Sequence, residues 1–274
     1  MLNWRRPLNK LGIRDFYNAF SCFLKIQYFK KFKRFIRVDA NDIRTIPIII
    51  ISFNQLSYLK KLITFLQRSD YTNIVIIDNA STYEPLLSYF EGIKDQVTIH
   101  KMKKNYGHMV FWKKEELFGL YGNGYYVVTD ADIVPDEQCP KNFLGYFKEI
   151  LDRDNSLTKV GFSLRIDNIP ESNLNKIKVL DWEGKFWKVK DVYNNYVADI
   201  DTTFALYKPK NMDQINSNFY KAIRTSFPYT AIHGGWYIDL NKLTPEQKYY
   251  MKTANYSSSW KLNEDGEIEN PLYH

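Results

Sequence analysis

Residues 46–52 read IPIIIIS, a run of β-branched side chains that ends in a small polar residue. A continuous apolar run is typical of a parallel strand, because helices cover both faces of a parallel sheet. The next residues, QLSYLKKLITFLQRS (55–69), place their leucines and isoleucine at helical spacing. A second apolar run, NIVIIDNAS (73–81), follows. This stretch therefore predicts a strand–helix–strand unit.

The same alternation continues along the chain. It predicts a helix near 83–91, a strand at 96–102, a helix at 108–122 and a strand at 124–132. Repeated alternation of strand and helix indicates an α/β fold with a mostly parallel, Rossmann-like sheet flanked by helices. Ligands of such sheets bind at the carboxyl ends of the strands. Ser52, Asp78 and Asp130 all fall at these ends.

The second half of the chain is less regular. Its patterns predict a helix at 139–154, strands at 159–166 and 197–207, and a polar loop at 167–196 between them. A last helix is predicted from Thr244, with Pro245 at its first position. We expect a helical arm (1–45) and one domain (46–274), composed of a nucleotide-binding half (46–135) and an acceptor half with the C-terminal helix (136–274).

The positive charge of the protein is concentrated in the arm. The 274 residues carry a net charge of +7, of which residues 1–45 contribute +8. Phenylalanines and isoleucines recur between the lysines and arginines of 16–37 at helical spacing, which predicts an amphipathic helix on an anionic membrane surface. Packing on the same domain or in a homodimer is the alternative. The remaining chain has no basic stripe, which argues against a nucleic-acid partner.

Two cysteines, Cys22 and Cys139, lie far apart without a CxxC partner. This pattern argues against a disulfide scaffold or a zinc site and favours a reducing compartment. No apolar run reaches the roughly 18 residues that a membrane span needs, and no secretory cleavage pattern is present. We therefore expect a cytoplasmic protein, peripheral at the inner face of the cell membrane.

The stretch YYVVTDADIVPD (125–136) brings Asp130, Asp132 and Asp136 close to one sheet edge. Carboxylates at short range repel one another unless a positive charge lies between them. A calcium loop is excluded, since its fifth, sixth and twelfth positions would here be Val134, Pro135 and Lys141. A turn or helix cap is one remaining interpretation. The other is a divalent cation held by these carboxylates and by substrate phosphates.

Four polar motifs follow the four predicted strands in order: SFNQ (52–55), DNAS (78–81), KNYGH (104–108) and DAD (130–132). With this ordered set, residues 46–240 resemble the GT-A glycosyltransferases, in particular family 2-like enzymes of bacterial surface polysaccharide synthesis. The resemblance implies a nucleotide-sugar donor, most often a UDP-sugar, and transfer with inversion to a saccharide or lipid-linked acceptor. It also implies Mn²⁺ or Mg²⁺ bridging the donor pyrophosphate to the Asp-x-Asp pair.

The resemblance assigns roles to individual residues of these motifs. Nucleotide contacts are implied for Ser52, Asn54, Asp78, Asn79, Asn105, Gly107, His108 and Asp130, and metal contacts for Asp130, Asp132 and the late histidine His233. The two glycines after His233 would allow close backbone approach. A buried histidine with satisfied hydrogen bonds is the alternative for that residue.

The catalytic base is expected among acidic residues downstream. Asp199 and Asp201 lie two residues apart in the predicted strand 197–207, so their side chains share one face. The resemblance implies an acidic base on the acceptor side. Asp201 is preferred because the residues after it, TTFALY, are typical of a strand that would anchor it beside the sheet. The Glu-Asp pair of many such enzymes is absent. A structural Asp201 is the alternative, and Asp181 and Glu183 are reserve candidates.

Three other functions stay open at the level of sequence. DIDTT (199–203) matches the Asp-x-Asp-x-Thr signature of haloacid-dehalogenase-type phosphohydrolases, with Asp199 as nucleophile, although the preceding residues form a poor strand. A nucleotidyltransferase on the same fold would need a Gly-rich triphosphate loop where this chain has SFNQL. A non-catalytic module that binds a membrane or a protein partner is the last alternative.

Overall fold

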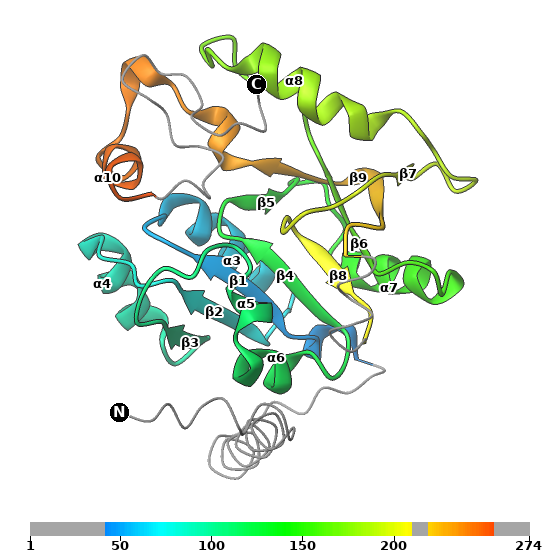
Figure 1. Cartoon of the computed structure of the whole chain (residues 1–274), viewed down its shortest axis with the longest axis horizontal. Helices are drawn as coiled ribbons and strands as arrows, with labels where there is room; N and C mark the ends of the chain where they lie inside the picture. Colours follow the sequence, from blue (N-terminus) through cyan, green and yellow to red (C-terminus); the bar gives the residue numbers. More distant parts are fainter. Residues whose placement is uncertain (1–41, 210–218, 255–274) are drawn as a thin grey trace, which may run out of the picture.

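The isoleucine run forms the strand that the sequence predicts: β1 (Ile48–Ser52), buried along its whole length. The computed structural model describes residues 42–209 and 219–254 (Figure 1). Its core is a nine-stranded sheet of order β3-β2-β1-β4-β8-β6-β9-β5, with β7 paired to β9. The α/β class and the helix-flanked sheet are therefore confirmed.

The first half of this sheet is parallel. Strands β2 (Ile74–Asp78), β3 (Thr98–Lys101) and β4 (Tyr126–Asp130) all run in the direction of β1. The register places Ser52 opposite Asp78 and Ile51 opposite Asp130. The carboxyl ends of β1, β2 and β4 consequently meet at one edge of the sheet.

The second half of the sheet mixes directions. Strand β8 (Ala205–Tyr207) lies antiparallel between β4 and β6 (Lys159–Leu164), while β9 (Ala222–His233) is parallel to β6. Strands β5 (Ile133–Pro135) and β7 (Tyr196–Val197) pair antiparallel with β9. This pairing brings Asp132, which directly precedes β5, next to His233 at the end of β9.

Helices cover both faces of the sheet. The side chains of β1 point alternately to the two faces and so contribute to two separate hydrophobic clusters. Ile48 and Ile50 belong to one hydrophobic cluster and Ile49 and Ile51 to another, because successive side chains of a strand point to opposite faces. The first cluster includes residues of α3 (Ser57–Arg68), α4 (Glu84–Ile93) and α7 (Phe143–Arg153). The second includes residues of α5 (Val110–Lys113) and α6 (Glu115–Tyr121), so the helix predicted at 108–122 is broken at Lys114.

Two predictions for the second half were wrong. Residues 167–196 are not all loop, since they contain α8 (Lys176–Glu183) and the 3₁₀ turn η2 (Gly184–Trp187). Residues 197–207 are not one strand, since 198–204 lie between β7 and β8 without strand pairing. Side chains of neighbouring strands, described below, bind main-chain carbonyls of this segment in place of a β ladder.

The last described helix, α10 (Pro245–Thr253), begins as predicted. The Thr244 hydroxyl accepts the N–H of Gln247, and the Gln247 side chain accepts the N–H of Thr244, which completes a capping box. The predicted basic arm lies outside the described residues except for Asp42–Thr45, so its amphipathic helix stays a prediction. Within the described ranges no helix is both long and apolar enough to cross a membrane.

Candidate functional site

The ends of β1 and β2 carry buried polar groups. Ser52 is fully buried, and its hydroxyl has no hydrogen-bond partner among the described residues. Opposite it, Asp78 accepts the N–H of Ser81 at 3.0 Å and is also buried. A buried hydroxyl without a partner is costly unless a ligand or water satisfies it. Ser52 thus lies at the strand end as expected, and its contact with a nucleotide stays a prediction.

Asn54 acts as a connector directly after β1. It adopts a left-handed conformation (φ 50°), and its amide oxygen accepts the N–H groups of Thr82 and Tyr83 at 2.8 and 3.0 Å. Its amide nitrogen donates to the hydroxyl of Thr253 on α10 at 2.9 Å. The side chain therefore ties together three segments at this edge, and its predicted contact with a nucleotide stays a prediction.

A second asparagine orders the loop after β3. The amide of Asn79 accepts the N–H of Tyr106 at 3.2 Å and donates to the carbonyl of Gly107 at 3.1 Å. Gly107 has φ 80°, and its N–H donates to the side chain of Asn105. His108 follows and is exposed. These predicted nucleotide contacts therefore share one ordered loop beside the end of β2.

Asp132 and His233 face each other across the β5–β9 pairing. Oδ2 of Asp132 lies 3.3 Å from Nδ1 of His233, and both residues are buried. Nδ1 accepts the N–H of Gly235 at 3.3 Å, so the proton of a neutral ring is on Nε2, and a metal bound at Nδ1 would replace this long hydrogen bond. Oδ2 of Asp132 accepts no hydrogen bond from the described residues. Burial lowers the pKa of His233 although Asp132 opposes the shift, which favours the neutral ring.

Asp130 is electrostatically coupled to both Asp132 and Asp201. Desolvation raises the pKa of Asp130 well above its ordinary value, and the charges of Asp132 and Asp201 raise it further. Oδ2 of Asp130 accepts the hydroxyl of Thr202 at 3.1 Å, which links it directly to the segment carrying Asp201. The structure therefore brings together the Asp-x-Asp pair and the predicted base, which are 69 or more residues apart in the sequence.

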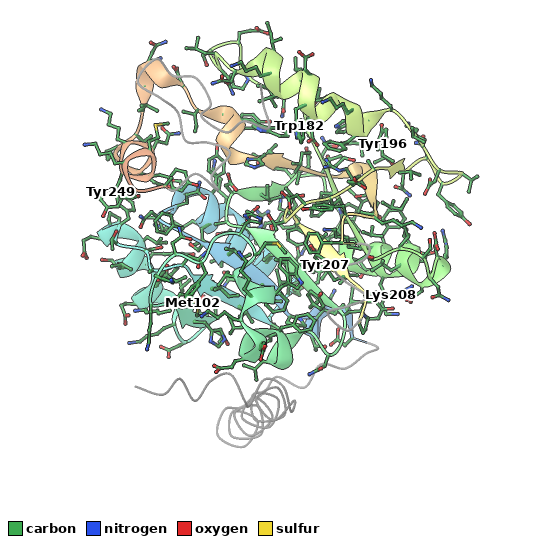
Figure 2. The ribbon with its side chains drawn as sticks, viewed as in Figure 1. Met102, Trp182, Tyr196, Tyr207, Lys208 and Tyr249 are labelled. Carbon is green, nitrogen blue, oxygen red and sulfur yellow. The ribbon has the colours of Figure 1, made fainter. Side chains whose placement is uncertain are left out.

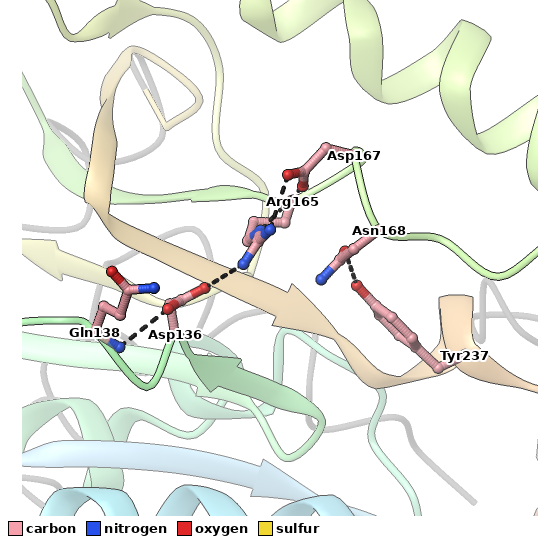
Figure 3. Close-up of polar contacts among 6 residues, drawn as sticks. All are labelled: Asp136, Gln138, Arg165, Asp167, Asn168 and Tyr237. Atoms are coloured by element: carbon pink, nitrogen blue, oxygen red, sulfur yellow. Dashed lines mark hydrogen bonds and ion pairs between the residues drawn. The ribbon is translucent and has the colours of Figure 1, made fainter.

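The third carboxylate of the same stretch has a different environment. Asp136 forms an ion pair with Arg165 at 2.6 Å and accepts the N–H of Gln138 at 3.0 Å (Figure 3). Arg165 also binds Asp167 at 2.8 Å. The opposing charge that Asp136 needs is thus a protein side chain, whereas no described cation pairs with Asp130 or Asp132.

The residues fit a divalent cation. Two neighbouring ligands of an octahedral ion with bonds of about 2.1 Å lie about 3.0 Å apart, and the facing atoms of Asp132 and His233 are 3.3 Å apart. No group of three or more His, Cys, Asp or Glu within the described ranges forms a complete cage. Mg²⁺ does not need one, because it usually combines one or two carboxylates with water and substrate phosphates.

Two residues at this edge were missed by sequence reasoning. Glu246 on α10 accepts the N–H groups of Leu56 and Ser57 at 2.8 and 3.0 Å, and so caps the start of α3 from a helix 190 residues away. Tyr58 follows, and burial together with Asp132 and Glu246 raises its pKa to about 12. A side chain at Gly234 would lie 2.5 Å from the Tyr58 ring, which explains the glycine.

The helices α10 and α8 lie on either side of this region. Figure 2 shows Tyr249 on α10 and Trp182 on α8, with Tyr207 of β8 in the middle of the molecule. Tyr249 donates to the carbonyl of Thr82 at 3.1 Å, so α10 lies directly over the loop after β2. The reserve candidate Asp181 is exposed on α8.

Buried charges lie behind Asp199 and Asp201, both of which are exposed. Lys159, at the start of β6, is fully buried, as is Arg224 on β9 in its ion pair with Glu183 of α8. Glu183, the other reserve candidate, is therefore bound to Arg224 beneath the surface. Lys159 opens the apolar strand KVGFSL, and a lysine at a buried strand position is the signal that sequence reasoning overlooked.

Stability should depend on pH through Lys159. Desolvation lowers the pKa of Lys159 from 10.5 to about 7, and the charge of Asp201 opposes the shift. Between about pH 7 and pH 10.5 the unfolded chain binds more protons at Lys159 than the folded protein does. The free energy of unfolding should therefore rise by up to about 1.4 kcal/mol per pH unit in this range. Urea unfolding of wild type and Lys159→Met at pH 7, 8 and 9 measures the difference between them. A pH-independent difference would contradict this titration.

Comparisons with known proteins add information about the fold. No protein-family model and no curated protein matches the chain. The mannosyltransferase PcManGT from Pyrobaculum calidifontis, solved with GDP-Man and Mn²⁺, is 14% identical over 89% of this chain and 72% of its own, with a TM-score of 0.42. Residues 1–349 of S. aureus TarS are 14% identical over 69% of this chain and 60% of that chain, with a TM-score of 0.43.

A third solved structure belongs to another class of enzyme. A putative glucose-1-phosphate thymidylyltransferase from Bacillus anthracis is 12% identical over 77% of this chain and 96% of its own, with a TM-score of 0.40. At these values the likeness carries no conclusion about the reaction, which has to come from the site residues. The structures similar to this chain thus include a mannosyltransferase and a putative thymidylyltransferase.

Proposed function

We propose that this protein is a metal-dependent glycosyltransferase that moves a sugar from a nucleotide-sugar, by inversion, to a hydroxyl of a saccharide or lipid-linked acceptor. One observation carries the proposal: the Thr202 hydroxyl donates to Oδ2 of Asp130 at 3.1 Å, so the segment of Asp201 lies beside the Asp-x-Asp pair, and no described cation pairs with Asp130 or Asp132. A metal site and a nearby carboxylate are what glycosyl transfer from a nucleoside diphosphate requires.

Each residue has a defined task in this reaction. Asp132 and His233 would hold a divalent ion, with Asp130 beside them, and the ion would supply Lewis-acid stabilisation of the leaving diphosphate. The Asp201 carboxylate accepts the proton of the acceptor hydroxyl. The hydroxyl oxygen bonds to the anomeric carbon, the bond from that carbon to the diphosphate oxygen breaks, and the nucleoside diphosphate leaves with the electron pair.

The nucleotide is assigned to the edge formed by β1 and β2. Ser52 offers a buried hydroxyl there that has no partner in the described part of the chain, and Asp78 lies opposite it in the sheet. The loop of Asn105 and Gly107 adjoins the same edge through Asn79. We prefer uracil as the base because the sequence motifs resemble those of enzymes that most often use UDP-sugars. The residues that select the donor sugar lie outside this edge of the sheet.

The phosphohydrolase alternative has weaker support. A nucleophilic Asp199 would be expected at the end of a central parallel strand, but it follows the short strand β7, which is antiparallel to β9. Asp199 therefore lacks the strand context that a nucleophile of this class has.

The arm completes the proposal. Its net charge of +8 and its spaced phenylalanines favour attachment to the anionic inner face of the cell membrane, where a lipid-linked acceptor would be available. Sedimentation with anionic vesicles, using the full chain and a chain lacking residues 1–40, tests this role. Binding that is lost with the arm and weakened by salt supports it, and arm-dependent dimerisation without vesicle binding refutes it.

Turnover of sugar nucleotides tests the function itself. Wild-type protein with Mn²⁺ and a panel of UDP-, GDP- and dTDP-sugars should release a nucleoside diphosphate from at least one donor, faster with a saccharide acceptor mixture. Release of inorganic phosphate would favour a phosphohydrolase. Release of pyrophosphate from a nucleoside triphosphate and a sugar phosphate would favour a nucleotidyltransferase.

A further inference from the structure

Residues 198–204, here called the Asp201 loop, carry the proposed base without strand pairing of their own. Two main-chain hydrogen bonds tie this loop to other segments, from the N–H of Ile200 to the carbonyl of Tyr220 and from the N–H of Phe162 to the carbonyl of Phe204, both at 3.2 Å. Three side-chain contacts join it to residues that are distant in sequence. The Thr202 hydroxyl donates to Asp130, and the other two contacts are made to main-chain carbonyls by buried cations. The position of the Asp201 carboxylate therefore depends on side chains far from it in sequence.

Lys159 makes the first of these cationic contacts. Its ammonium donates to the carbonyl of Asp201 at 2.9 Å and to the hydroxyl of Tyr207 at 3.1 Å. The same ammonium lies 3.8 Å from the centroid of the Phe219 ring, within cation–π range. The buried amino group of Lys159, surrounded by aromatic rings, thus donates to the main chain of the residue proposed as the base.

Arg224 makes the second contact from the neighbouring strand β9. Its Nε donates to the carbonyl of Asp199 at 2.8 Å, and its Nη1 pairs with the carboxylate of Glu183. Its guanidinium also stacks 4.0 Å from the centroid of the Phe186 ring. Contacts with Glu183 of α8 and Phe186 of η2 therefore hold the guanidinium in the orientation in which it binds the loop.

The two contacts fall on alternate carbonyls on either side of Ile200, which is itself fully buried. Burying charged groups is unfavourable unless they are well paired, and apolar residues of similar size could fill the same space. Both side chains instead bind the Asp201 loop, which forms no β ladder within the described residues. A displacement of about 1 Å at a reacting group can cost about 100-fold in rate. Contacts that fix the Asp201 loop would therefore raise the rate of a reaction that uses the Asp201 carboxylate.

We propose that Lys159 and Arg224 are positioning residues, which hold the carbonyls of Asp201 and Asp199 so that the Asp201 carboxylate stays beside Asp130 and Asp132. This inference rests on the proposed function. Neither cation touches the reacting atoms, so both act through Asp201. Their removal should slow transfer and leave donor binding unchanged.

The test compares Lys159→Met with Lys208→Met as matched control. Lys208 also donates to main-chain carbonyls, those of Leu151 and Asp154, which lie outside the site. With the donor that wild type turns over, Lys159→Met should lower kcat about 100-fold and change the donor KM less than threefold. Lys208→Met should change both less than threefold. If Lys159→Met does not fold, Lys159→Gln, whose side chain is one atom shorter, replaces it.

Two further readouts separate positioning from general stabilisation. In an Asp201→Asn background, Lys159→Met should cost less than threefold in kcat, because residues that act as a unit are not additive. Hydrogen exchange should be about tenfold faster for amides of the Asp201 loop in Lys159→Met and unchanged in Lys208→Met. Independent losses in the double variant, or unchanged exchange, would overturn the inference while the function stands. No turnover by wild type would overturn the function as well.

Discussion

Replacing Asp132 with alanine is expected to lower sugar-nucleotide turnover at saturating Mn²⁺ by about 10³-fold, the effect typical of losing strong electrostatic stabilisation. The reason is geometric: Oδ2 of Asp132 faces Nδ1 of His233 at 3.3 Å and accepts no hydrogen bond from the described residues. Release of nucleoside diphosphate at several Mn²⁺ concentrations measures the loss. The Mn²⁺ needed for half-maximal rate should also rise.

Asp136→Asn is the matched control for this variant, because it removes a carboxylate from the same stretch. Asp136 is paired with Arg165 at 2.6 Å. We expect the turnover of Asp136→Asn to stay within about threefold of wild type, and its unfolding free energy to fall by about 1–2 kcal/mol, since Arg165 is partly exposed. Equal turnover losses in Asp132→Ala and Asp136→Asn would contradict a metal site at Asp132.

Asp201→Asn is the second large effect. Loss of a general base typically costs about 10²–10⁴-fold in rate, and asparagine keeps the size of the side chain. The hydrogen bonds to Asp130 and Lys159 use the Thr202 hydroxyl and the Asp201 main chain, so they should survive the change. We therefore expect kcat to fall by about 10³-fold with little change in Mn²⁺-dependent nucleotide binding.

Asp199→Asn tests the assignment of the base within the same loop. Asp199 is exposed, and its carbonyl, which Arg224 binds, is unaffected by the substitution. We expect less than a fivefold change in kcat. A large loss in Asp199→Asn with an active Asp201→Asn protein would transfer the base to Asp199, and would also remove the basis for Lys159 as a positioning residue of Asp201.

The parallel half of the fold could be predicted because its information is local. The isoleucine runs of β1 and β2 and the amphipathic face of α3 each appear within about 12 residues, and all three form where expected. The meeting of Ser52, Asp78 and Asp130 at one edge then follows from parallel strands alone. Thr244 and Gln247 likewise encode the start of α10 locally.

The second half could be predicted less well because its contacts are distant in sequence. The Asp201 loop is shaped by Lys159 and Arg224, 42 and 25 residues away from the carbonyls that they bind. Nothing near Asp136 indicates that Arg165 neutralises it. The helix α8 was missed because its apolar spacing is weak and it lies in an Asn-rich segment that favours loop. For the Asp201 loop and for Asp136, the decisive partner is a residue distant in sequence, which no local pattern identifies.

Calorimetric titration of wild-type protein with UDP and GDP, with and without Mn²⁺, tests the central claim most directly. A metal-dependent nucleotide site at Asp132 and His233 predicts binding of at least one of these nucleotides that is at least tenfold tighter with Mn²⁺, and no such enhancement in Asp132→Ala. Binding of neither nucleotide under either condition, or equal binding in Asp132→Ala, would contradict a nucleotide-sugar site at this edge of the sheet.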